Sequence, residues 1–331
     1  MERKRNTPTI HTIISPLLFI LAFTSILELS ISTLSFDFYA GSCPNVELLV
    51  RNTVRSAAAF DQTAPAKLLR LVFHDCMVEG CDGSVLLEGN GTERADPANA
   101  SLGGFQVVDS IKNLLEFLCP GTVSCADILA LAARESVMIA GGPFVRILTG
   151  RRDGRVSSIS NVRPNMVDTT FSMEQMAQVF SSKGLSMEDL VTLSGAHTIG
   201  TAHCRAFGDR FGEDAKGRPI PVDSSMDRDY AEQLISQCPP NVNPDVTVNN
   251  DPATAMVFDN VYYQNLMRGR GLFHSDSELS TDGRTRDQVQ FFAQNQEAFF
   301  QSWANSFVRL TNVGVKTGDE GEVRRICGAV N

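Results

Sequence analysis

Apolar residues recur at three- and four-residue spacings along most of the chain, which is the pattern of helices that bury one face. Ser124 and Ser172 each begin a capping box, in which the serine side chain accepts one of the first free backbone N–H groups of a helix. These patterns predict a mainly α-helical fold. The predicted helices span residues 45–59, 65–76, 104–118, 124–140, 172–183, 186–206, 258–268, 284–293 and 296–310.

Two segments depart from the helical pattern. Residues 146–149 and 156–159 flank the turn sequence Arg152-Asp153-Gly154, and together they predict one short β-hairpin. Residues 212–256 are rich in proline, aspartate and asparagine. We expect this stretch to form a long excursion with one short helix near residues 227–236.

The N-terminus carries a pattern of its own. A short basic segment precedes an apolar run at residues 13–27, and small residues suit cleavage before Thr33. A membrane anchor is the alternative, but Ser15-Pro16 interrupts the run, which is shorter than the ~18 apolar residues that a span needs. The sequence therefore predicts a secretory signal peptide at 1–32 and a single domain at 33–331, with no later membrane segment.

Charge and cysteine content narrow the class of protein. The net charge is −9, so nucleic acid is not an expected partner. Eight cysteines follow the apolar run, and an even number behind a signal peptide predicts four disulfides. No pair has the Cys-x-x-Cys spacing of a zinc site. Spacing alone leaves 105 pairings open for Cys43, Cys76, Cys81, Cys119, Cys125, Cys204, Cys238 and Cys327.

The most informative pair of residues is Arg70 and His74. Four residues apart on a predicted helix, they share one face. A neutral imidazole can take a proton, and a guanidinium stays charged and can stabilise a leaving anion. This pair suits cleavage of the O–O bond of a peroxide. A second isolated histidine, His197, lies in another predicted helix, and the two histidines resemble the two sides of a haem pocket.

The motifs around these histidines closely resemble those of the class III plant haem peroxidases. The resemblance covers essentially all of the predicted mature chain. It implies helices in two lobes around one haem b, with hydrogen peroxide reduced while small, phenolic donors are oxidised in one-electron steps. The matching segments are 38–39, 43–44, 70–84, 122–127, 150–153, 189–204, 258–263, 271–272 and 326–327.

On the distal side of the haem, the resemblance implies that His74 is the acid–base residue and Arg70 the cationic partner. Asn99 is the implied hydrogen-bond acceptor for the imidazole, and Phe73 is expected to face the cofactor. An amide carbonyl can orient an imidazole without raising its basicity as much as a carboxylate would. A lone histidine is more often a core residue, but one with Arg70 beside it favours the catalytic interpretation.

On the proximal side, the resemblance implies that His197 is the iron ligand and that Asp276 accepts its Nδ1 proton. A carboxylate partner makes the ligand electron-rich. His203 lies six residues later, about 240° around the predicted helix, and is not expected to be a ligand. Pro164 is the implied contact for the organic donor.

The resemblance also implies two calcium ions per chain. Carboxylate, hydroxyl and backbone oxygens in tight loops suit this hard cation, although single aspartates in such loops are often ordinary caps. The implied distal ligands are Asp75, Val78, Gly80, Asp82 and Ser84. The implied proximal ligands are Thr198, Asp251, Thr254, Val257 and Asp259.

Family connectivity pairs Cys43 with Cys119, Cys76 with Cys81, Cys125 with Cys327, and Cys204 with Cys238. The sequence also has two glycosylation sequons, at Asn90 and at Asn99. Asn90 lies in a predicted loop and is open to modification. Asn99 is expected to be bare, because its assigned role requires burial beside His74.

The resemblance thus predicts a monomeric enzyme that is secreted to the extracellular space or cell wall. One alternative is a non-catalytic, calcium-stabilised extracellular binding or wall-associated protein of the same fold. The combination of Arg70, His74, Asn99, His197 and Asp276 argues against it, because a binding module has no need of all five. A secreted zinc hydrolase is a second alternative, but it would need clustered zinc ligands, and the sequence shows none.

Overall fold

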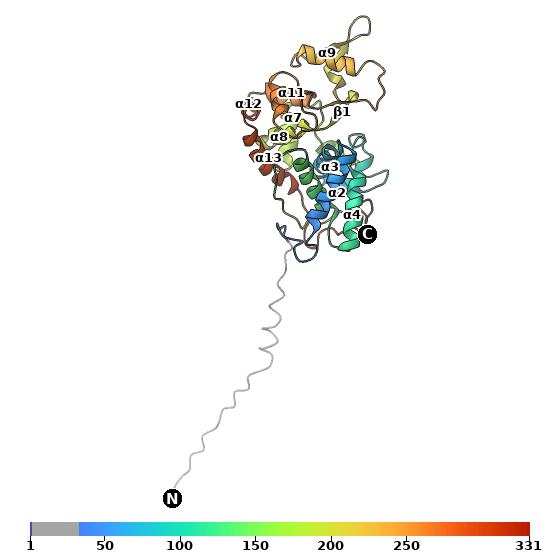
Figure 1. Ribbon diagram of the computed structural model, residues 1–331, viewed down its shortest axis with the longest axis vertical. Coiled ribbons are helices and arrows are strands. Elements are labelled where there is room, and N and C mark those ends of the chain that lie inside the picture. Colours follow the sequence, from blue (N-terminus) through green and yellow to red (C-terminus); the bar gives the residue numbers. More distant parts are fainter. Residues whose placement is uncertain (2–32) are drawn as a thin grey trace. The chain divides into compact units, whose positions relative to one another are not determined.

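Packed helices account for most of the regular structure (Figure 1). The computed structural model describes Met1 and residues 33–331, so the predicted signal peptide lies, Met1 apart, outside the described residues. The long helices are α2 (Val46–Phe60), α3 (Ala64–Val78), α4 (Phe105–Leu118), α5 (Cys125–Ile139) and α13 (Gln296–Thr311). The shorter ones are α6 (Val162–Asn165), α7 (Met173–Ser182), α8 (Met187–Ser194), α9 (Arg228–Gln237), α10 (Val261–Met267), α11 (His274–Thr281) and α12 (Arg286–Gln294). The prediction of a mainly α-helical fold is confirmed.

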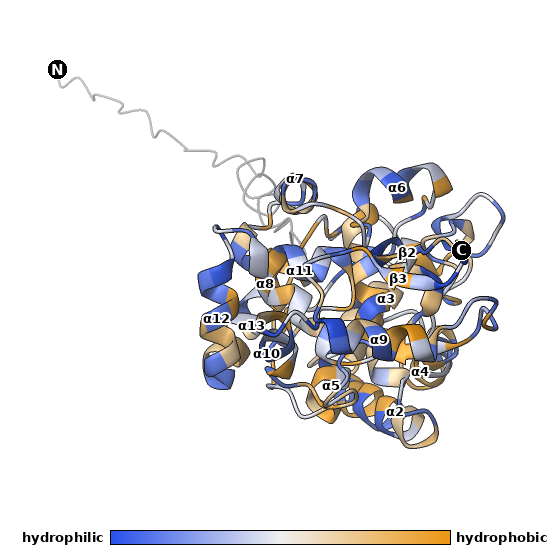
Figure 2. Ribbon diagram, turned by 90° about the horizontal axis from the view of Figure 1, so that it is seen from above, coloured by the Kyte–Doolittle hydropathy of each residue, from blue (hydrophilic) through white to orange (hydrophobic). Residues whose placement is uncertain are grey.

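The core is built around α3 and α5, which pack against each other. Every residue of α5 from Cys125 to Val137 is buried, so this helix has no solvent face. A smaller hydrophobic cluster contains Phe207, Tyr230 and Phe273 beside α9. By contrast, α12 buries two of its residues and is coloured largely hydrophilic at the edge of Figure 2.

The predicted hairpin at residues 146–159 is wrong. Thr149 pairs instead with Ser35, Arg152 with Lys316, and Asp153 with Glu322. This segment is paired with the two ends of the domain, and pairing over such sequence distances leaves no local signal. A short hairpin occurs elsewhere, where β2 (Phe211–Glu213) runs antiparallel to β3 (Pro219–Pro221).

The single helix predicted over residues 186–206 is also wrong. The chain passes from α8 into the 3₁₀ turn η4 (Gly195–Thr198), then into β1 (Thr201–His203) and the 3₁₀ segment η5 (Cys204–Arg210). Gly200 has a φ of +96°, a conformation that ends a helix and that glycine adopts without strain. The chain beyond it pairs with β4 (Thr247–Asn249). His203 therefore lies in a strand, and the helical angle used to exclude it as a ligand does not apply.

Four disulfides cross-link the domain, with the pairings that the resemblance implies. The bonds are Cys43–Cys119, Cys76–Cys81, Cys125–Cys327 and Cys204–Cys238. The longest-range of them joins the start of α5 to the C-terminal segment. The smallest loop directly follows the residues of α3 that carry the candidate chemistry.

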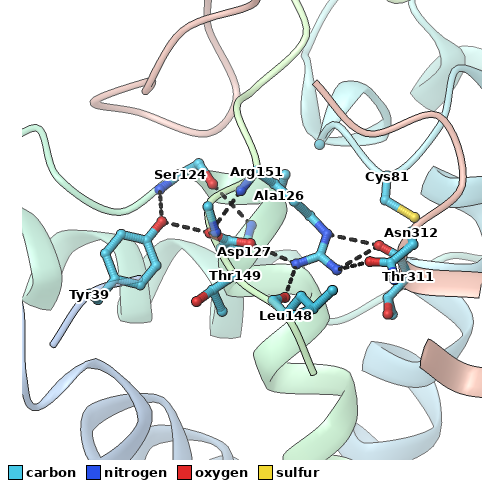
Figure 3. A network of polar contacts seen from close by, with 12 residues as sticks. Tyr39, Cys81, Ser124, Ala126, Asp127, Leu148, Thr149, Arg151, Thr311 and Asn312 are labelled. Atoms are coloured by element: carbon cyan, nitrogen blue, oxygen red, sulfur yellow. Dashed lines mark hydrogen bonds and ion pairs between the residues drawn. The ribbon is translucent and has the colours of Figure 1, made fainter. Parts of the chain in front are cut away.

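A buried ion pair joins the start of α5 to Arg151, which also donates hydrogen bonds to the end of α13 (Figure 3). Arg151 Nη1 donates to Asp127 Oδ1 at 2.8 Å, and both side chains are 0% exposed. The Tyr39 hydroxyl and the Gly150 backbone N–H donate to Asp127 Oδ2 at 2.6 and 2.7 Å. Arg151 Nε and Nη2 donate to the Thr311 carbonyl at 2.9 and 2.6 Å. The network thus connects the N-terminal segment, α5 and α13.

Candidate active site

Helix α3 brings Arg70 and His74 into direct contact. Pro65 lies in its first turn, where a missing N–H breaks no helical hydrogen bond, and the helix continues to Val78. Arg70 Nε donates to His74 Nε2 at 3.2 Å. The shared helix face predicted from their spacing is therefore present.

Asn99 holds the other side of the His74 ring. Its Oδ1 lies 2.7 Å from His74 Nδ1, and its Nδ2 donates to the Glu93 carbonyl at 2.9 Å. Because the amide nitrogen is used by Glu93, the amide oxygen faces the imidazole and accepts from Nδ1–H. His74 Nε2 is then the nitrogen with a lone pair.

Electrostatics keep the His74 ring neutral. Burial, and then the positive charge of Arg70, lower the pKa of His74 to about 3, although the hydrogen bond that His74 donates to Asn99 acts in the opposite direction. A neutral ring can accept a proton at Nε2. The Arg70 guanidinium is solvent-exposed and donates to Ser101 Oγ at 3.0 Å.

The second histidine is fixed through one ring nitrogen. His197 lies in η4, and its Nδ1 is 2.8 Å from Oδ1 of Asp276 in α11. Its Nε2 has no hydrogen-bond partner among the described residues, and the side chain is 39% exposed. An imidazole anchored at one nitrogen and free at the other is the usual arrangement of a metal-ligating histidine. His197 is therefore suited to act as an iron ligand.

Asp276 is held as a carboxylate. Burial would raise its pKa, but the charge of His197, together with hydrogen bonds from His197, the Phe273 N–H and the Tyr262 hydroxyl, holds that pKa below its usual value. The rings of Phe273 and Tyr262 also meet the imidazole edge-on, with centroids 5.3 and 6.0 Å away.

Arg210 was not among the predicted site residues, yet it fixes the segment before α11. Its Nη1 donates to the carbonyls of Gly271, Leu272 and Phe273 at 2.6, 3.1 and 2.9 Å. The Arg210 side chain is 0% exposed and forms an ion pair with Asp223 at 2.9 Å. No sequence pattern connects this arginine to three carbonyls more than 60 residues away, so the sequence did not reveal it.

Tyr262 was likewise missed, although it lies within one of the matching segments. Its hydroxyl donates to Asp276 Oδ1 at 2.7 Å. A tyrosine pair, Tyr262 and Tyr263, is easily read as core packing, and both residues are indeed buried. The signal that distinguishes them is the hydroxyl partner, which is visible only in three dimensions.

The predicted distal calcium loop has an excess of buried negative charge. Burial, and then the charge of Asp82, raise the pKa of Asp75 well above its usual value. Burial also raises the pKa of Glu93 to about 7. Ser84 Oγ is buried with no hydrogen-bond partner among the described residues. Buried carboxyl groups crowded together beside an orphaned hydroxyl fit a cation.

Two lysines approach this distal loop. Lys316 Nζ contacts Asp82 Oδ2, and Lys183 Nζ donates to the Val78 carbonyl at 3.0 Å. Gly80 lies between the predicted ligands Val78 and Asp82 and has a φ of +104°. Among the described residues, no three His, Cys, Asp or Glu side chains form a metal-binding group by themselves. A calcium ion here would thus depend on hydroxyl and backbone oxygens as well.

The five predicted proximal calcium ligands lie close together. The hydroxyls of Thr198 and Thr254 donate to Asp259 Oδ1 at 3.1 and 3.2 Å, and Thr198 also lies 3.3 Å from the Val257 carbonyl. Asp251 Oδ1 accepts two backbone N–H groups, whereas its Oδ2 is buried without a partner among the described residues. An orphaned carboxylate oxygen in this donor set fits a hard cation.

Two predicted residues lie at the margins of the site. Phe73 is half-buried beside the His74 ring, with centroids 6.2 Å apart. Pro164 is exposed in the short helix α6. Arg163, next to it, forms an ion pair with Asp96 at 3.1 Å.

The chain is similar to known proteins over most of its length. The family model described as Peroxidase matches residues 50–295. The chain is 57% identical to Peroxidase 18 of Arabidopsis thaliana over 322 residues, which cover 97% of each chain. It is 58% identical to Peroxidase 46 of the same plant over 317 residues, covering 96% of this chain and 97% of the relative. Peroxidase 51 is 44% identical over 322 residues, covering 95% and 97%.

Proposed function

The chain belongs to the peroxidase family, among the plant haem peroxidases, and we propose that His74 and His197 form the two sides of its haem site. As a member it is a peroxidase, an oxidoreductase that uses a haem cofactor, hydrogen peroxide and a reducing donor. The observation that carries the proposal is the complementary anchoring of the two rings. Asn99 is hydrogen-bonded to Nδ1 of His74, and Asp276 is hydrogen-bonded to Nδ1 of His197. Neither partner therefore occupies the Nε2 atom of its ring.

His74 performs the proton transfer. Its neutral Nε2 takes a proton from one oxygen of hydrogen peroxide and returns it to the other oxygen, which departs as water. In the structure Arg70 Nε donates to this same nitrogen, so Arg70 has to turn away before the base can act. The guanidinium is also held by a hydrogen bond to Ser101 Oγ at 3.0 Å, so this movement is part of the proposal.

Arg70 then stabilises charge. Once it is released from His74, the guanidinium can donate hydrogen bonds to the oxygen that becomes negative as the O–O bond breaks. Haem, when bound, supplies the iron that binds peroxide and stores the oxidising equivalents that donors later remove. His197 would hold that iron through Nε2, and Asp276 fixes the ring orientation.

We further propose that the donors are small phenolics and that they contact the exposed surface at Pro164. Bound calcium in both predicted loops would neutralise the buried carboxylates of Asp75, Asp82 and Asp251 and stiffen the segments that carry the histidines. The orphaned Ser84 Oγ and Asp251 Oδ2 support these two sites. A haem b and two calcium ions per chain are the proposed cofactors.

We also propose that the protein is a secreted, extracellular monomer with a signal peptide at 1–32. Four disulfides support an oxidising compartment. In the part of the chain that the structure describes, no helix is both long and apolar enough to cross a bilayer. The non-catalytic alternative gains no support, because a neutral base anchored by Asn99 beside the cation of Arg70 serves chemistry rather than binding.

The test is His74→Leu, followed by stopped-flow measurement of the Soret change on adding peroxide. Loss of a general base predicts a second-order rate constant lower by about 10² to 10⁴, with haem content unchanged. His203→Gln is the matched control, because this histidine lies in β1 outside the proposed site. A near-normal rate in His74→Leu would refute the assigned role.

A further inference from the structure

Two donors converge on a single oxygen of the Asp276 carboxylate. His197 Nδ1 lies 2.8 Å from Oδ1, and the Tyr262 hydroxyl lies 2.7 Å from the same atom. The backbone N–H of Phe273 donates to the other oxygen at 3.0 Å. Asp276 and Tyr262 are 3% and 2% exposed, so bulk water does not compete for these positions.

Tyr262 reaches this oxygen from a separate element. It lies on α10, which packs against both η4 with His197 and α11 with Asp276. Its ring meets the imidazole edge-on, with centroids 6.0 Å apart and an interplanar angle of 85°. The direction of the hydroxyl is therefore set by helix packing as well as by Asp276.

Sharing one acceptor atom has an electronic consequence. Each donor that bonds to a carboxylate oxygen draws electron density from it, so the second donor is held less strongly. A hydroxyl on Oδ1 thus weakens the pull of Asp276 on the Nδ1 proton of His197. The imidazole then keeps more neutral character and donates less electron density through Nε2.

We propose that Tyr262 is a positioning residue that moderates electron donation by His197, because it shares Oδ1 of Asp276 with that ligand. The inference rests on the proposed role of His197 as the haem-iron ligand. Tyr262 does not contact peroxide or donor in this scheme. It acts through Asp276 alone.

The neighbouring tyrosine supplies a matched control. Tyr263 lies on the same helix, is 0% exposed, and donates its hydroxyl to the carbonyls of Val191 and Thr192 at 3.0 and 3.1 Å. Tyr263→Phe removes the same atom as Tyr262→Phe from an equally buried position without altering Asp276. A difference between the two variants therefore reports the shared oxygen, and not the loss of a buried hydroxyl.

The experiment compares both variants with the parent as haem-loaded enzymes. Resonance Raman spectra give the iron–histidine stretch of the ferrous form, and spectroelectrochemistry gives the reduction potential. Tyr262→Phe is expected to raise the stretching frequency and lower the potential, while Tyr263→Phe changes neither. Equal shifts in both variants, no shift in Tyr262→Phe, or a shift to lower frequency would each overturn the proposal.

Two further measurements separate the possible failures. If Tyr262→Phe does not retain haem, a fluorotyrosine at position 262 keeps the hydroxyl but makes it a stronger donor. It is expected to lower the stretch and raise the potential, and unchanged bands overturn the proposal. An iron–histidine band that persists in His197→Ala overturns the ligand assignment itself, which distinguishes that outcome from a failure confined to Tyr262.

Discussion

Replacing Arg151 with methionine should destabilise the fold strongly, because it breaks the buried ion pair of Figure 3 while keeping an unbranched, apolar side chain of similar length. Asp127 would remain fully buried, with the Tyr39 hydroxyl and the Gly150 N–H still donating to Oδ2. Its Oδ1 would lose the guanidinium at 2.8 Å. The Thr311 carbonyl would lose both arginine donors.

The magnitude follows from these losses. Removing one partner of a buried pair costs about 3–5 kcal/mol, because the other charge is left uncompensated. Stranding a buried carbonyl costs about 1–3 kcal/mol by itself, and these contributions overlap. We therefore expect Arg151→Met to lower the free energy of unfolding by about 3–5 kcal/mol.

The assay is guanidinium denaturation with the disulfides intact, followed by far-ultraviolet circular dichroism. Arg228→Ala is the control, because its pair with Glu232 lies on the surface with side chains 86% and 61% exposed. Such a pair is worth at most about 1 kcal/mol. The midpoint for this control should stay close to that of the parent.

A double-mutant cycle measures the coupling energy between Arg151 and Asp127 directly. Asp127→Asn removes the charge that Arg151→Met leaves behind, so the double variant should be more stable than the sum of the two single losses predicts. A coupling of about 1–3 kcal/mol is expected for groups in direct contact. Additive losses, or an Arg151→Met loss below about 1 kcal/mol, would show that the network is not the anchor described above.

Three other predictions concern the proposed haem and calcium sites. Arg210→Leu should speed haem transfer to apomyoglobin, because three carbonyls before Asp276 lose their donor; an unchanged transfer rate would contradict this. Exhaustive chelation of calcium should lower activity, and indifference to chelation would count against both ion sites. Lys316→Met should tighten calcium binding about tenfold or more, because Lys316 contacts the proposed ligand Asp82 and two like unit charges ~4 Å apart repel each other by about 1–4 kcal/mol; equal affinities by chelator competition would exclude Lys316 as a competitor.

Helix positions were predictable where apolar periodicity and caps act locally. Ser124 and Ser172 do accept the backbone N–H groups of Asp127 and Gln175, at 3.1 and 3.4 Å, and α5 and α7 begin where expected. The error over residues 186–206 has a specific cause. The apolar pattern continues past His197, but the left-handed backbone at Gly200 turns the chain into β1.

The motif residues of the candidate site could be predicted from the sequence, but the residues that hold them in place could not. Arg70 and His74 follow from spacing, and Asn99, His197 and Asp276 from the resemblance. Tyr262 and Arg210 act through contacts that are long-range in sequence, so no local pattern marks them. The α11 helix was missed too, because an eight-residue helix offers too few turns for its periodicity to stand out.

The amide that orients His74 also begins a glycan acceptor sequence, Asn99-Ala100-Ser101. In the folded protein Asn99 is 2% exposed, and the Ser101 hydroxyl of the same triplet accepts from Arg70. Sugar transfer needs an accessible asparagine side chain. During the proposed export, burial of this triplet therefore competes in time with its modification, and a sugar on Asn99 Nδ2 would be too bulky for the buried position from which this amide orients His74.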